Sequence, residues 1–60
     1  MSKITESQRF LVRDIELVLS LSFREWCEDH KLSEDDKLSA TEFIHEYGKE
    51  YAEWCKLLHR

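Results

Sequence analysis

The stretch FLVRDIELVLSLSFREW, residues 10–26, decides how this chain folds. At about 100° per residue, the centre of its apolar face consists of Leu11, Ile15 and Val18, and further apolar residues flank this centre on both sides. The apolar arc covers roughly two-thirds of the helix circumference, whereas an ordinary surface helix needs a stripe of about 100°. Such a helix has more apolar surface than one partner helix can cover.

The composition restricts the class of protein further. Sixty residues form one domain, 1–60, and a domain of this size buries only about 60% of its unfolded surface, so self-association is the first candidate for extra stability. The chain has no proline and a single glycine, Gly48, which favours long helices. Two cysteines without a signal peptide are typical of a reducing cytoplasm, and the apolar run 17–23 is too short to cross a bilayer. We therefore expect a cytoplasmic all-α protein.

Two capping sequences indicate where the helices begin. Thr5 opens a T-x-x-Q capping box, and Ser39 opens an S-x-x-E box ahead of a second periodic segment. These signals predict one helix over about 6–29, a polar loop over 30–39 and a second helix over about 40–58. The apolar side of the second helix covers only about half of its circumference.

Two helices joined by a short loop predict an antiparallel helical hairpin. A hairpin leaves one flank of the first helix uncovered, and an exposed apolar flank indicates an interface. We therefore expect two hairpins to pair as a homodimeric four-helix bundle, although the sequence does not decide which flank forms the contact. The predicted dimer contact draws on Phe10, Val12, Leu17, Leu19, Leu21, Phe23 and Trp26.

The cysteines and histidines form the one pattern that resembles a metal site. Cys27-x-x-His30 and Cys55-x-x-x-His59 provide the ligand types of a structural zinc site. In an antiparallel hairpin, however, the two halves lie on the order of 20 Å apart along the helix axis. Only a dimer that placed the loop of one chain beside the termini of the other could close the site. The zinc site is therefore a third alternative, and we predict no metal and no cofactor.

The basic residues permit a second alternative. Arg9, Arg13 and Arg24 lie along one helical stripe and could contact phosphates in a small DNA-binding regulator. Glu16 interrupts the stripe, and the formal net charge of the chain is −4. Glu16 and the excess of acidic residues favour a solvated, ion-paired face over a nucleic-acid surface.

The loop carries the candidates for partner binding. Glu34, Asp35 and Asp36 concentrate negative charge there, which suits a basic surface on another protein. The same residues also suit the N-terminus of a helical turn, because its dipole favours negative charge. No glycine-rich phosphate loop and no nucleophile with a base at recognisable spacing is present, so we expect no enzyme.

In general character, the chain resembles the small acidic helical accessory proteins encoded in early regions of temperate lambdoid bacteriophages. The resemblance rests on the length of sixty residues, the Met-Ser-Lys start, the helical composition and the lack of a catalytic signature. It implies a protein of the infected bacterial cytoplasm that binds a host or phage regulatory protein, and it transfers no functional residue. The sequence thus predicts a non-enzymatic protein interaction module, whose partner and process it does not identify.

Overall fold

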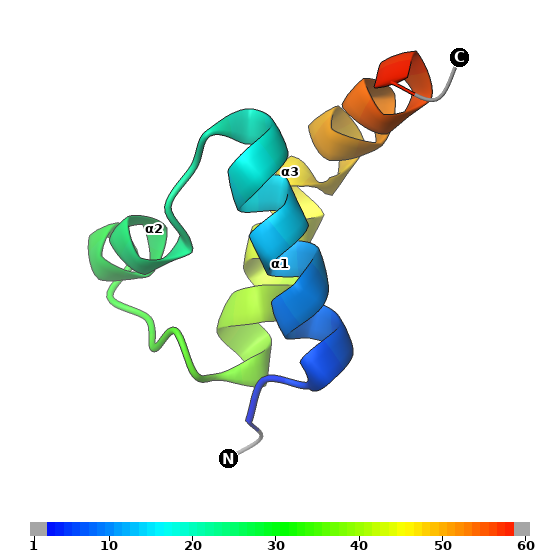
Figure 1. The fold of residues 1–60 in the computed structure, drawn as a ribbon. Coiled ribbons are helices and arrows are strands. Elements are labelled where there is room, and N and C mark those ends of the chain that lie inside the picture. The colour runs from blue at the N-terminus through cyan, green and yellow to red at the C-terminus, as the bar shows by residue number, and fades with distance from the viewer. Residues whose placement is uncertain (1–2, 59–60) are drawn as a thin grey trace.

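The computed structural model describes residues 3–58 and folds them into three helices (Figure 1). The helices are α1 (Glu6–Leu19), α2 (Phe23–Asp29) and α3 (Lys37–Leu58). Within the described residues there is no sheet, and a single isolated antiparallel bridge joins Lys3 to Asp36. The prediction of an all-α fold is confirmed, whereas the prediction of two long helices is wrong.

The start of α1 follows the predicted capping box. The Thr5 hydroxyl accepts the Gln8 backbone N–H at 3.1 Å, and the Gln8 side-chain oxygen accepts the Thr5 backbone N–H at 3.2 Å. Two N–H groups that lack helical partners are thereby satisfied. The Gln8 amide also donates to the Thr41 hydroxyl on α3 at 3.0 Å, so the cap joins the two helices.

The predicted continuous helix over 6–29 breaks at Ser20. This residue has a left-handed backbone, with φ 54°, and the next N–H, that of Leu21, donates to the Glu16 carbonyl at 3.0 Å in a Schellman-type ending. Ser22 then begins α2, where its hydroxyl accepts the Glu25 N–H, and the Glu16 carboxylate accepts the Phe23 N–H at 2.9 Å. The break is physically reasonable because serine favours caps over helix interiors.

The third helix begins before the predicted position. The Asp36 carboxylate accepts the Leu38 N–H at 3.0 Å, and α3 starts at Lys37. Ser39, the predicted cap, lies instead inside the first turns and is 1% exposed. The predicted loop 30–39 and helix 40–58 are corrected to a connection over 30–36 followed by α3. A carboxylate favours a helix N-terminus through the helix dipole as well as through its hydrogen bond, so Asp36 is an effective cap.

Helices α1 and α3 run parallel, which corrects the predicted antiparallel hairpin. Contacts between them advance in the same direction along both chains: the Ile4 N–H donates to the Asp35 carbonyl at 2.9 Å, and the Tyr51 hydroxyl donates to Asp14 at 3.1 Å. Figure 1 shows the cause, since α2 and the connection after it carry the chain back beside the start of α1. Because α2 is an additional helix, α3 packs parallel to α1 and not antiparallel to it.

The core lies where the three helices meet. Phe43 of α3 is fully buried, with its ring centroid 4.9 Å from that of Phe23 and 5.3 Å from that of Trp26, both in edge-to-face arrangements. The buried apolar set contains Val12, Ile15, Phe23, Trp26, Cys27, Ala40 and Phe43. The short helix α2 therefore supplies much of the aromatic core.

Candidate interaction surfaces

The final turns of α3 extend beyond the body of the protein, where Figure 1 shows them projecting past the end of α1. Trp54, Leu57 and Leu58 are exposed by 47%, 59% and 67%, respectively. We call these three residues the α3 apolar end. Trp54 and Leu58 continue the face of α3 that carries Phe43 in the core, because residues at these spacings share one side of a helix. Past the end of α1, no other helix of the described residues covers this face of α3.

A second apolar surface lies on the outer side of α1. Phe10 and Leu17 are separated by seven residues and thus share one face, and about three-quarters of each side chain is exposed. We call this pair the α1 outer pair. It faces away from Val12 and Ile15, which are buried against the rest of the chain.

The predicted dimer contact is therefore divided between the core and the surface. Val12, Phe23 and Trp26 are buried within the single chain, while Leu19 and Leu21 are partly buried and pack against its core. The chain uses these residues itself because the break at Ser20 lets α2 fold over α3. Of the residues predicted for the dimer contact, only Phe10 and Leu17, the α1 outer pair, are largely exposed. Fewer apolar side chains are therefore left uncovered by the single chain than a continuous helix over 6–29 would leave.

The third surface is a groove between α2 and the first half of α3, with a volume of about 640 Å³. We call it the tryptophan groove. Its lining is Trp26, His30, Leu32, Leu38, Glu42, His45 and Glu46. Leu32 and Leu38 are 41% and 71% exposed and are absent from the core cluster, so their apolar surface is open to a partner.

A second Schellman-type ending shapes one side of the tryptophan groove. Lys31 has a left-handed backbone, with φ 56°, and donates its N–H to the Glu28 carbonyl at 3.2 Å. The Leu32 N–H donates to the Cys27 carbonyl at 2.7 Å, which places Leu32 in the position that usually contacts the end of the helix it follows. This turn ends α2 and brings Leu32 to the edge of the groove.

Aromatic and charged groups fix the base of the tryptophan groove. The His30 ring stacks on Trp26 with centroids 4.3 Å apart, and His30 Nδ1 lies 2.8 Å from the Trp26 carbonyl oxygen. The Trp26 indole N–H donates to the Glu46 carboxylate at 2.7 Å, and this carboxylate joins α2 to α3. Charge-assisted hydrogen bonds are stronger than neutral ones, so Trp26 is held in one orientation.

Sequence reasoning missed the tryptophan groove, although a signal was present. Leu32 and Leu38 are the two apolar residues of the otherwise polar segment 30–39. In the structure both leucines line the same groove, between α2 and the start of α3.

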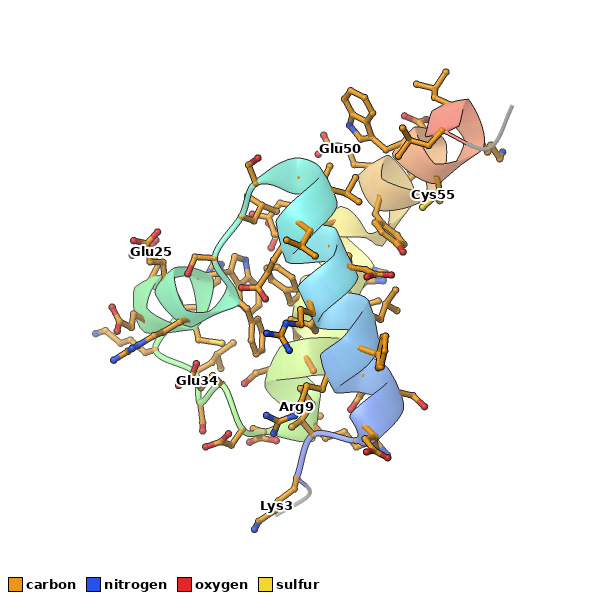
Figure 2. All side chains as sticks on the ribbon, in the orientation of Figure 1. Lys3, Arg9, Glu25, Glu34, Glu50 and Cys55 are labelled. Carbon is orange, nitrogen blue, oxygen red and sulfur yellow. The ribbon has the colours of Figure 1, made fainter. Side chains whose placement is uncertain are left out.

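The three arginines and part of the acidic loop meet in a different cleft, of about 400 Å³. This arginine cleft is lined by Ile4, Arg9, Val12, Arg13, Glu16, Phe23, Arg24, Glu34 and Asp35. Arg9 extends from α1 on the same side as Glu34 of the connection, and both are labelled in Figure 2. Three cationic and three anionic side chains thus share one surface. Asp36, the third acidic candidate, lies outside this lining and caps α3.

The candidate zinc ligands occupy separate environments. Cys27 is 2% exposed in the core, and its pKa is raised by burial and by the nearby charge of Glu34. Cys55 lies on the projecting part of α3 (Figure 2), and His59 lies outside the described residues. Both cysteines are free thiols, and residues 3–58 contain no cluster of three or more groups suited to a metal ion.

Tyr51 links α3 to α1 near the projecting end. Its hydroxyl donates to Asp14 at 3.1 Å, and hydrogen bonding with Cys55, together with burial and Asp14, raises the Tyr51 pKa to about 12. The neutral phenol is the form that keeps this contact, because it alone has a proton to donate.

Among residues 3–58, no helix combines the length and apolar character needed to span a bilayer. The chain matches no protein family, no curated protein and no solved structure in the comparisons made with each. Its function must therefore be inferred from these surfaces alone.

Proposed function

We propose that this chain is a non-enzymatic protein interaction module, a small regulatory or accessory protein that pairs with a second copy and binds a further protein. The observation that carries the proposal is the exposure of large apolar side chains at two places, the α1 outer pair and the α3 apolar end. Large apolar side chains exposed on one face of a small protein favour interfaces. In keeping with the resemblance to phage accessory proteins, the further partner would be a host or phage regulatory protein in the bacterial cytoplasm.

Pairing through these surfaces also has an energetic reason. A projecting helix end receives little support from the rest of the fold, and short isolated helical segments are marginal in water. Burying Trp54, Leu57 and Leu58 against a second copy would contribute about 25 cal/mol for each Å² of apolar surface removed from water. The proposed dimer replaces the four-helix bundle of two hairpins, since each chain contributes three helices, of which α1 and α3 are parallel.

A DNA-binding regulator remains the second candidate because Arg9, Arg13 and Arg24 line one cleft. The carboxylates of Glu16, Glu34 and Asp35 in the same lining weaken this alternative, because they repel phosphate. A gel-shift assay with duplex DNA at low salt separates the candidates. Retardation that disappears in Arg9→Ala or Arg13→Ala would favour the regulator, and free DNA at every protein concentration would favour the interaction module.

The interaction module is tested by the solution mass of matched lysine variants. Leu17→Lys changes the α1 outer pair, Leu57→Lys changes the α3 apolar end, and Ala52→Lys adds the same charge at another exposed position of α3. Each lysine lowers the negative net charge, so a loss of pairing cannot arise from added repulsion between acidic chains. We expect Leu17→Lys or Leu57→Lys to weaken self-association at least tenfold, while Ala52→Lys leaves it unchanged. Equal association in all three variants would contradict pairing through these surfaces.

A further inference from the structure

We propose that the tryptophan groove binds a cationic segment of another protein, one that seats a large apolar side chain against Trp26 and places lysine or arginine beside Glu42 and Glu46. This inference deepens the proposed interaction function and rests on it. It assigns a location and a chemistry to the further partner, which the α1 outer pair and the α3 apolar end do not.

The apolar part of the tryptophan groove is suited to an anchoring side chain. Trp26 forms its base, and Leu32 and Leu38 approach from the connection and from α3. Trp26 is 9% exposed and is held by the Glu46 hydrogen bond and by the His30 ring, so a ligand meets the small exposed part of a preorganised ring beside the more exposed side chains of Leu32 and Leu38. The volume of about 640 Å³ is within the range of about 300–1,000 Å³ that is usual for ligand-binding clefts.

The charge of the lining selects a cationic partner. Glu42 and Glu46 both line the tryptophan groove beside His30 and His45, and its lining contains neither lysine nor arginine. Glu46 already accepts the indole N–H through one carboxylate oxygen, and the second oxygen is available to a cation. The net charge of −4 adds a longer-range attraction for a basic segment.

A second copy of this chain provides a poorer occupant. The α3 apolar end has suitable apolar side chains, but the surrounding sequence, residues 49–60, mixes Glu50 and Glu53 with Lys49, Lys56 and Arg60. This segment therefore has no cluster of positive charge to place beside Glu42 and Glu46, and the second copy as a whole carries the same net charge of −4. Charge complementarity therefore favours a different, basic protein segment.

The binding experiment uses Trp26 as its own reporter. Trp54→Phe removes the other tryptophan of the sequence and leaves Trp26 as its only indole. The probe is a synthetic helical peptide of leucine and lysine with leucine at positions i, i+3, i+4 and i+7, and the control peptide has glutamate in place of every lysine. We expect the lysine peptide to change the Trp26 emission saturably, and the glutamate peptide to leave it unchanged.

Variants in this background locate the binding. Leu38→Lys alters a 71% exposed groove residue, and we expect it to weaken binding of the lysine peptide about tenfold. Glu42→Gln should weaken binding about two- to fivefold, whereas Glu53→Gln removes the same charge elsewhere on α3 and should leave affinity unchanged. Far-ultraviolet circular dichroism checks that each variant keeps its helices.

Three results would overturn the proposal. The first is equal affinity of the lysine peptide for Leu38→Lys, Glu42→Gln and Glu53→Gln. The second is equal binding of the glutamate peptide, and the third is a Trp26 emission that changes with protein concentration alone, which would assign the groove to a second copy. If neither peptide binds while Leu17→Lys or Leu57→Lys still reduces the solution mass, the groove assignment fails and the interaction function stands.

Discussion

Replacing Phe43 by alanine should remove most of the stability of this protein. Phe43 is fully buried, and its ring lies 4.9 Å from Phe23, 5.3 Å from Trp26 and 5.1 Å from Tyr47, measured between centroids. A buried Phe→Ala change costs about 3–5 kcal/mol, because apolar burial is lost and a cavity remains. Sixty residues at about 0.05–0.15 kcal/mol per residue give a total free energy of unfolding of about 3–9 kcal/mol. The expected cost of Phe43→Ala is thus comparable to the total free energy of unfolding.

The matched control is Phe10→Ala, which deletes the same atoms from a side chain that is 75% exposed. Urea unfolding followed by circular dichroism, at the lowest practical protein concentration to limit pairing, measures both variants. We expect Phe10→Ala to stay within about 0.5 kcal/mol of the parent chain, as exposed substitutions usually do. Equal destabilisation by the two changes would refute the assignment of the core to the junction of α2 and α3.

Three further predictions concern the helix break, the tyrosine contact and the thiols. Ser20→Gly should raise the free energy of unfolding by about 1 kcal/mol, because glycine adopts the left-handed conformation without strain; a loss of stability in a thermal melt would count against the break. The pKa of Tyr51 is raised from 10 to about 12 in the folded protein. The contribution of Tyr51 to the free energy of unfolding is therefore complete below pH 10 and declines as the pH rises toward 12. Tyr51→Phe, which loses the bond to Asp14, should flatten that part of the stability profile, and an unchanged alkaline decline would contradict this role. Cys55 should react with a thiol reagent well before Cys27, whose thiol is buried and has a raised pKa, and equal rates in the folded protein would contradict the core position of Cys27.

The sequence predicts the helical class and the first cap because local chemistry determines both. Thr5 and Gln8 meet within one turn, and their reciprocal hydrogen bonds need no distant contact. The break at Ser20 is harder to predict, because the apolar pattern continues through it and no glycine or proline marks it. A left-handed serine is stabilised here by Leu21 and Glu16 contacts that appear only in the folded chain.

Most errors in the predicted interface follow from that one break. If residues 6–29 formed a single helix, Phe23 and Trp26 would lie on the surplus flank and require a second chain. With α2 as a separate helix, the same two residues pack around Phe43 and fill the core. The arginine cleft arises from the same rearrangement, since it joins Arg9 of α1 to Glu34 and Asp35 of the connection, which a hairpin keeps apart.

The central claim is that the apolar side chains left exposed on α1 and α3 serve association. Sedimentation equilibrium of the unmodified chain across a wide concentration range tests it most directly. We predict a mass that rises with concentration from the monomer value of 7.3 kDa toward twice that value. A mass of 7.3 kDa at every concentration would contradict pairing through these surfaces.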